Sequence, residues 1–483
     1  MNNRWRALGV LAFGLGLVIL DGTIVGVSLP AILADLNLSL TEGQWINSLY
    51  SVVFAALLLV AGWLGDRVGR RTVFLAGLLI LGIGSALAGL AADAGLLIAA
   101  RAVQGVGGSL VLPSSLSTTS SMFRGRERAV AFGIWGSVMS GMAAIGPLLG
   151  GWITGAYSWP LIFWINVPLV VGLVILALLW VPQTGGGAKP GFDVVGLLLG
   201  GLGAGAVVFG LIEATSLGWW QPKAPLVIGG WQWAAPVSAV PIFIAGGLLL
   251  LSVFGWWELR RAHRGLSVLL HIELFRLPSF RWGNLAGVLI FAGEFGLIFV
   301  LPLFLIRAGG LSPIQAGLVL SALAVGALVA GLSARMLADW LGTVRLIRLG
   351  LALEVVGVLL AFVLLGFGPL LLAAALVIYG VGLGLASAQL TSTVLAQVPL
   401  ELMGSASGTQ STLRQLGSAL GVAFSGGVLG SFVGDEVMTA PVAAFSAGAQ
   451  TAIAGASLLL AVGFGVTLLL PRDVDLVESA NPA

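Results

Sequence analysis

The chain has 483 residues, of which 58% are hydrophobic and only 8% are charged, with a mean hydropathy of +1.09. A soluble domain carries about 25% charged residues, so this composition excludes a soluble protein and indicates a polytopic membrane protein. Cysteine is absent, which excludes disulfides, iron–sulfur clusters and thiolate metal sites, and we predict no metal site. The net charge of +3 is spread among loops, a pattern that predicts no nucleic-acid partner.

Apolar stretches long enough to cross a bilayer recur along the whole chain, since a spanning helix needs about 20 largely apolar residues. Fourteen such spans are predicted, at 7–29, 45–64, 74–91, 95–117, 130–153, 161–181, 193–213, 234–257, 282–305, 313–334, 346–366, 369–396, 404–430 and 446–470. Eighteen loop arginines and lysines lie on the side of the N-terminus, and only Lys223 and Arg307 lie on the other. Because cytoplasmic loops retain positive charge, both termini are expected in the cytoplasm.

Charged residues are concentrated between the second and third spans. The segment from Gly62 to Arg71 reads GWLGDRVGRR and contains Asp66, Arg67, Arg70 and Arg71. Its glycines at 62, 65 and 69 are expected to let two helix ends approach closely. A positively charged cytoplasmic anchor would account for the arginines alone.

A second copy of this segment indicates an internal duplication. The sequence LGDRVG at 64–69 is repeated less closely as LADWLG at 337–342, where Asp339 is kept and Trp340 replaces Arg67. We therefore predict an all-α protein with a six-helix bundle at 1–181 and a second at 282–470. The segment 182–281 would supply two extra membrane helices, and 471–483 a cytoplasmic tail. Duplicated halves with a site between them are typical of alternating-access carriers.

The fifth span contains a run of small residues around a proline. It reads GMAAIGPLLGG and includes Gly141, Gly146, Pro147, Gly150 and Gly151. Glycines leave a smooth helix surface and proline removes a backbone donor, so a neighbouring helix can pack tightly there or slide.

Ionisable residues within spans are the strongest functional candidates, because they are costly to hold in a membrane. Asp21 lies about 13 Å and Arg101 about 9 Å from the outer ends of their helices, so an ion pair between them is feasible. Glu294 has no cation within one helical turn, and a desolvated carboxyl group suits reversible protonation. Glu354 and Arg414 lie at comparable depth and could pair with each other or with Glu294, which leaves a structural salt bridge as the alternative.

These motifs carry a resemblance to a known family. The segment 62–71 resembles the signature loop of the major facilitator superfamily. ILDGTIV at 19–25, RAVQG at 101–105, the glycine run at 141–151 and FWINVP at 163–168 resemble motifs of its fourteen-span drug:proton antiporters. The resemblance implies a gating role for the loop residues and Asp339, and a role for the fifth-span glycines in sealing the carrier against leak. It implies no cofactor, the proton gradient being the energy source.

The expected function is proton-coupled export of amphipathic or lipophilic, mainly cationic, drugs from a bacterial inner membrane. Asp21, Glu294 and Glu354 are the expected proton-coupling acids, and the partners are small organic substrates, protons and membrane lipids, with the protein as a monomer. A lipid or glycolipid flippase on the same scaffold is the alternative. An enzyme is disfavoured by the lack of a nucleophile triad or metal pair in the spans, and an ATP-driven pump by the lack of a phosphate-loop lysine.

Overall fold

The computed structural model describes residues 3–123, 125–184, 191, 193–228, 231–233, 235–399, 402–434 and 440–471. Its helices are α1 (Asn3–Asp35), α2 (Leu40–Val68), α3 (Arg70–Gly89), α4 (Ala94–Met122), α5 (Gly125–Ala156), α6 (Leu161–Trp164), α7 (Asn166–Trp180), α8 (Val194–Leu217), α9 (Ala239–His263), η1 (Ile272–Arg276), α10 (Pro278–Arg307), α11 (Pro313–Leu341), α12 (Thr343–Leu364), α13 (Pro369–Leu395), α14 (Met403–Val433) and α15 (Val442–Thr467). A short hairpin, β1 (Val227–Ile228) with β2 (Trp231–Gln232), joins α8 to α9.

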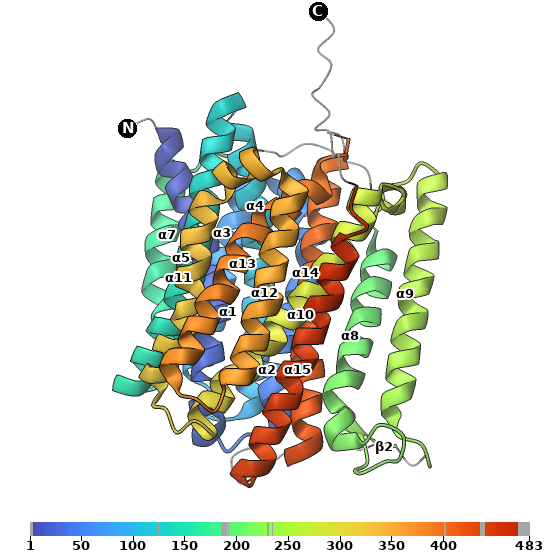
Figure 1. Cartoon of the computed structure of the whole chain (residues 1–483). Coiled ribbons are helices and arrows are strands. Elements are labelled where there is room, and N and C mark those ends of the chain that lie inside the picture. The colour runs from blue at the N-terminus through green and yellow to red at the C-terminus, as the bar shows by residue number, and fades with distance from the viewer. Residues whose placement is uncertain are drawn as a thin grey trace, which may run out of the picture.

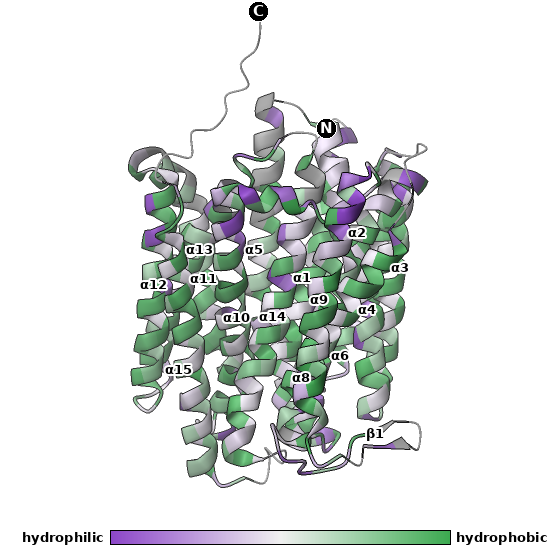
Figure 2. Cartoon of the chain, turned by 90° about the vertical axis from the view of Figure 1, so that its right-hand side faces the viewer, coloured by the Kyte–Doolittle hydropathy of each residue, from purple (hydrophilic) through white to green (hydrophobic). Residues whose placement is uncertain are grey.

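The helices form an elongated bundle (Figure 1), and the chain is essentially all-helical. Within the described residues, twelve helical segments are long and apolar enough to cross a membrane. The helices α2 and α5, of 29 and 32 residues, are not among the twelve, and each includes residues whose side chains are not described. Hydrophobic residues cover the length of the bundle and hydrophilic ones gather towards its two ends (Figure 2).

Every predicted span falls on a helix, but most helices run several residues beyond the predicted ends. The extension is physical, because a helix continues through the interfacial layer after its apolar stretch has ended. The predicted span 161–181 is divided at Ile165 into α6 and α7. Pro168 explains the break, because it has no N–H to donate to the carbonyl group of Trp164, four residues earlier.

The second helices of the two duplicated halves begin in the same way. Ser39 accepts a hydrogen bond from the backbone N–H of Glu42, whose side chain bonds back to the N–H of Ser39. Ser312 and Gln315 form the same reciprocal capping box at the start of α11. Both helices then end at a glycine with positive φ, Gly69 at 107° and Gly342 at 83°. The internal repeat therefore extends to the details of the helix ends.

The packing of the helices links segments far apart in the chain. In one group α1 packs on α5 and α7, and α4 packs on α2 and α3. In another, α10 packs on α14 and α15, and α13 packs on α11 and α12. The groups meet where α5 contacts α11 and where α2 contacts α14.

The pair α8–α9 lies at one edge of the bundle (Figure 1). Helix α8 packs on both α2 and α14, whereas α9 packs on α8 and η1. A hydrogen bond of 2.8 Å from Trp45 Nε1 of α2 to Glu213 Oε1 ties α8 to α2. Ser216 Oγ donates to the other oxygen of the same carboxyl group, at 2.6 Å.

Replacing Trp45 with phenylalanine is expected to lower the free energy of unfolding by about 1–3 kcal/mol, because it removes a donor from a partly buried charged acceptor. The thermal unfolding midpoint of the purified protein measures this effect. Trp220→Phe is the control, since that tryptophan is 72% exposed. Equal midpoints for the two variants would contradict the docking of α8 through Glu213.

Candidate functional site

The first buried charge cluster joins five helices of the N-terminal half, α1, α2, α3, α4 and α7. Arg101 Nη1 of α4 lies 2.6 Å from Asp21 Oδ2 of α1, and both side chains are almost completely buried. The guanidinium also donates through Nε to the carbonyl oxygen of Ile46, at 3.1 Å. It lies 4.3 Å from the ring centroid of Tyr50. The ion pair that depth along the helices made feasible is therefore formed.

Amides complete the coordination of the Asp21 carboxylate. Gln104 Nε2 and Asn166 Nδ2 donate to Asp21 Oδ1 at 2.7 and 2.8 Å. Both amides also donate to Ser85 Oγ, and Arg101 donates to Gln104 Oε1 at 2.9 Å. Asp21 thus accepts three hydrogen bonds from α4 and α7, so its negative charge is stabilised without solvent.

Sequence reasoning did not assign Gln104, Asn166 or Ser85 to this site. A signal was present, because each is a polar residue inside an apolar span, where unpartnered polar groups are costly. What was missing was the rotation of each helix, which decides whether a polar side chain points to Asp21 or elsewhere.

The second buried cluster lies in the C-terminal half. Glu294 of α10 and Glu354 of α12 are 6% and 1% exposed. Glu294 Oε1 and both carboxyl oxygens of Glu354 are buried without a hydrogen-bond partner. The Tyr379 hydroxyl group of α13 is also buried and without a partner. Electrostatic interactions connect these three groups.

Arg414 of α14 is the cation of this second cluster. Its guanidinium lies 4.1 Å from the ring centroid of Phe291 and donates to Thr391 Oγ1 at 3.2 Å. It interacts electrostatically with Glu294, but within the described residues it forms no ion pair of 4.0 Å or less with either glutamate. The close pairing that the sequence left open is therefore not made.

A narrow cavity connects the members of the second cluster. The volume open to the centres of water molecules is about 20 Å³, enough for one or two waters. Glu294, Glu354 and Arg414 line it, together with the polar side chains of Asn284, Thr391 and Gln410. The two clusters therefore differ: the first is closed and fully bonded, and the second retains unsatisfied acceptors beside open space.

The candidate gating segment is shorter than the sequence suggested. Helix α2 continues through Arg67 to Val68 and α3 begins at Arg70, so Gly69 is the only residue between them. A Cβ atom at Gly69 would collide with the side chain of Gln183. Gly62, in contrast, has open space beside it, so the predicted close approach does not occur there. The neighbour at Gly69 is a side chain from the segment after α7 and not another helix.

The arginines of this segment bind the ends of neighbouring helices. Arg70 Nη1 donates to the carbonyl oxygen of Ser117 at 2.9 Å, and Arg71 Nη1 to that of Val181 at 3.3 Å. Arg67 lies over the ring of Trp63, 5.2 Å from its centroid. The side chains of Asp66 and Asp339 lie outside the described part, so their predicted contacts remain predictions.

The glycine run of α5 contacts two different helices. Gly146 and Gly150 face Thr23 and Ile24 of α1. A Cβ atom at Gly151 would lie 2.5 Å from the carbonyl oxygen of Pro313 in α11, and one at Gly317 would lie 2.6 Å from that of Pro147. Gly141 faces open space and makes no such approach. Tight packing is thus confirmed for the last part of the run only.

Helices of membrane-spanning length with buried ionic clusters in two duplicated halves define a membrane transporter of the carrier type. The chain belongs to the Major Facilitator Superfamily, whose family model matches residues 11–422. It is accordingly a transporter and not an enzyme, and it is an integral protein of the inner membrane. Members of this family generally use ion gradients and need no cofactor.

Curated relatives match over most of their length. The chain is 32% identical to the multidrug efflux pump LfrA of Mycolicibacterium smegmatis, covering 100% of this chain and 91% of that one. It is 32% identical to the tetracenomycin C resistance and export protein of Streptomyces glaucescens, covering 89% of this chain and 77% of that one.

Solved structures show the same fold. A bacterial homologue of the human lysosomal transporter Spinster, in an inward-facing and unoccupied conformation, matches with a TM-score of 0.65 and 16% identity. The match covers 97% of this chain and 98% of that one. At this identity the likeness concerns the fold alone.

Proposed function

We propose that the protein exports amphipathic or lipophilic, mainly cationic, organic compounds in exchange for protons by alternating access. The observation that carries this proposal is the buried acid pair Glu294 and Glu354 in one half of a carrier fold, beside a buried ion pair at Asp21 in the other half. Buried acids in a membrane carrier are natural proton sites. Relatives named as a multidrug efflux pump and a drug export protein support the substrate class.

The proposed architecture has fourteen spans, with α2 and α5 added to the twelve segments above, and both termini in the cytoplasm. One bundle would comprise residues 1–181 and the other 282–470, with α8 and α9 as extra helices in 182–281. The tail 471–483 lies almost entirely outside the described residues. The cross-bundle contacts of α5 with α11 and of α2 with α14 support this division.

Proton and drug would be exchanged through competition. A protonated acid favours one conformation and bound drug the other, so each ligand shifts the equilibrium between inward and outward states. The segment with Asp66, Arg67, Arg70 and Arg71 would act as a latch between α2, α3 and the end of α4, and Asp339 would have the corresponding role in the second half. No cofactor enters this scheme, and the protein would act as a monomer surrounded by membrane lipids.

Sealed proteoliposomes with an imposed pH gradient test the proposal. Lipophilic cations and neutral drugs are expected to dissipate the gradient in the presence of the wild-type protein. Glu294→Gln should reduce the initial rate at least tenfold, whereas Glu273→Gln should not change it, because Glu273 lies in an exposed segment with 62% of its side chain accessible.

A lipid or glycolipid exporter remains the alternative function, since the same scaffold would serve it. Fluorescent lipid crossing the bilayer of these proteoliposomes, with no drug-dependent proton movement, would contradict drug antiport and favour lipid export.

A further inference from the structure

We infer that Glu294 and Glu354 form one proton-binding unit, to which Arg414 supplies a positive charge, whereas Asp21 has a structural role and does not exchange the proton. This assignment rests on the proposed proton antiport and names the acids that serve it. From the sequence, Asp21, Glu294 and Glu354 were all expected to couple protons, and the assignment distinguishes Asp21 from the two glutamates.

Hydrogen bonding distinguishes the two kinds of acid. Asp21 accepts from Arg101, Gln104 and Asn166 at 2.6–2.8 Å. Such a carboxylate gains nothing from a proton, which would weaken each of these bonds. Glu294 Oε1 and both oxygens of Glu354 accept no hydrogen bond, so binding a proton there disrupts no existing contact.

The balance of charge around the glutamates requires one proton. Among the described residues, Arg414 is the one cation that lines the cavity with both carboxyl groups. It interacts electrostatically with Glu294, and its guanidinium contacts Phe291 and Thr391. Two neighbouring buried carboxyl groups resist being ionised together, so their protons are lost in two separate steps that belong to the pair. The unit is therefore neutral when one of the two carboxyl groups is protonated.

No other cation in the described surroundings offsets this excess of acid. From α13 the nearby titratable group is Tyr379, and α15, which packs on both α10 and α12, has none between Val442 and Thr467. In α12, Arg348 lies about 9 Å along the helix from Glu354 and donates to the carbonyl oxygen of Thr467. Asp21 of α1 is paired with Arg101. The side chains of Arg335 and Asp339 in α11 lie outside the described part.

The cavity beside the glutamates has polar side chains on the side towards the start of α10. Its lining includes Gln410, Thr391 and Asn284, and Asn284 lies about 15 Å from Glu294 along α10. The Asn284 Oδ1 atom is buried without a partner beside it. Polar groups around water-sized space can support proton exchange through water.

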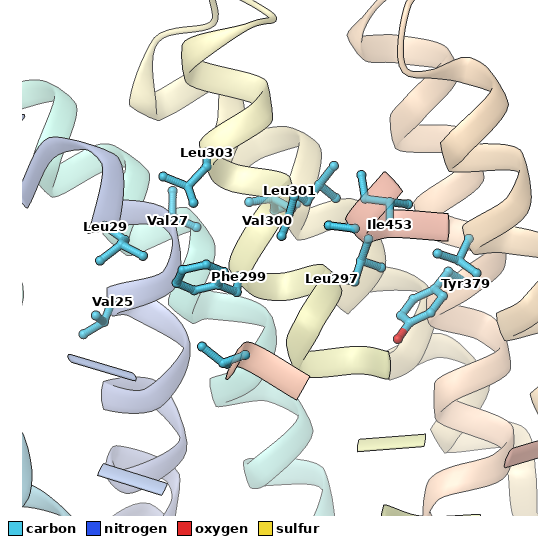
Figure 3. Close-up of a cluster of buried hydrophobic side chains, with 14 of the residues drawn as sticks. Val25, Val27, Leu29, Leu297, Phe299, Val300, Leu301, Leu303, Tyr379 and Ile453 are labelled. Atoms are coloured by element: carbon cyan, nitrogen blue, oxygen red, sulfur yellow. The ribbon is translucent and has the colours of Figure 1, made fainter. Parts of the chain in front are cut away.

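On the other side of the glutamates the helices are closed by hydrophobic side chains. Figure 3 shows Leu297, Val300 and Leu301 of α10 in one cluster with Ile453 of α15, and Tyr379 beside them. The polar lining of the cavity therefore lies towards the start of α10, and hydrophobic side chains lie on the other side of the glutamates.

A paired proton site is expected to respond to single substitutions differently from two independent acids. When Glu354 is replaced by glutamine, one carboxyl group and one cation line the cavity, so their charges balance without a proton and the exchangeable proton is lost. Glu294→Gln leaves the same count of charges, with Glu354 as the remaining carboxyl group. Each single substitution should therefore remove the whole exchangeable proton rather than half of it.

Infrared difference spectroscopy of the full-length protein in lipid membranes, between alkaline and mildly acidic pH, tests this assignment without any drug. The wild type should show a C=O stretching band of a buried carboxylic acid. The band should disappear in Glu294→Gln and in Glu354→Gln and persist in Asp21→Asn. A band that survives both glutamine variants, or that is lost in Asp21→Asn alone, would overturn the assignment.

A second measurement avoids substitutions, because Asp21→Asn can disturb folding. A hydrophobic carbodiimide reacts with protonated carboxylic acids in apolar surroundings, and peptide mass spectrometry locates the adduct in the wild type. Modification at Glu294 or Glu354 but not at Asp21 is expected; modification at Asp21 alone would refute the inference.

The failure of this inference can be distinguished from the failure of the proposed function. Drug-driven proton movement that persists in both glutamine variants would support antiport and contradict the glutamate proton unit. A glutamate-dependent infrared band without drug-driven proton movement would support the proton unit and contradict antiport.

Discussion

Replacing Arg101 with leucine is expected to lower the free energy of unfolding by about 3–5 kcal/mol, because it leaves a buried carboxylate without its counter-ion. Asp21 and Arg101 are 0% and 1% exposed, so water cannot take the place of the guanidinium. The same substitution also leaves the Gln104 Oε1 atom without its donor and removes one hydrogen bond from the carbonyl oxygen of Ile46. Thermal unfolding of the purified protein measures the loss.

A matched control is available in an exposed ion pair. Arg4 and Glu127 lie 3.3 Å apart with about half of each side chain accessible, and Arg4→Leu should cost no more than about 1 kcal/mol. A double variant, Arg101→Leu with Asp21→Asn, should recover part of the stability lost in Arg101→Leu, because it removes the unpaired charge. If Arg101→Leu were as mild as Arg4→Leu, the closed ionic cluster would not exist as described.

Alanine substitutions in α5 should have opposite effects at two glycines of one motif. Gly151→Ala is expected to destabilise the protein by about 1–3 kcal/mol, because the new Cβ atom would lie 2.5 Å from the backbone oxygen of Pro313 and the helices must separate. Backbone atoms cannot move aside as a flexible side chain can. Gly141→Ala meets nothing within 4 Å and should stabilise the helix by about 0.5–1 kcal/mol.

The same two variants bear on function, because α5 and α11 join the two halves of the carrier. In proteoliposomes, Gly151→Ala should slow drug-driven proton movement, while Gly141→Ala should match the wild type. Thermal midpoints measured beside the rates separate loss of folding from loss of activity. Equal effects of the two substitutions on both quantities would show that the α5–α11 contact does not limit packing or transport.

The sequence by itself determined the membrane class, the helical segments and the ionisable residues deep within the spans, although it did not single out Asp193 and Glu258, which are also buried. These follow from local properties, since an apolar stretch of about 20 residues spans a bilayer whatever surrounds it. A charged residue in such a stretch is unusual wherever it faces. The duplication was also visible, because LGDRVG and LADWLG carry the turn glycines that the structure places at positive φ.

Only the tertiary structure decided which polar groups meet. Asp21, Gln104 and Asn166 are separated by more than 60 residues at each step, and their contact depends on how three helices are rotated against one another. Arg414 was an equally plausible partner for Glu294 or Glu354, but stacking on Phe291 holds it away from a close pair with either. The same applies to glycines: Gly141 and Gly151 belong to one motif, yet only Gly151 has a neighbouring backbone against it. Composition and spacing determine what a helix can bury, whereas helix rotation and approach determine the partner that it is buried against.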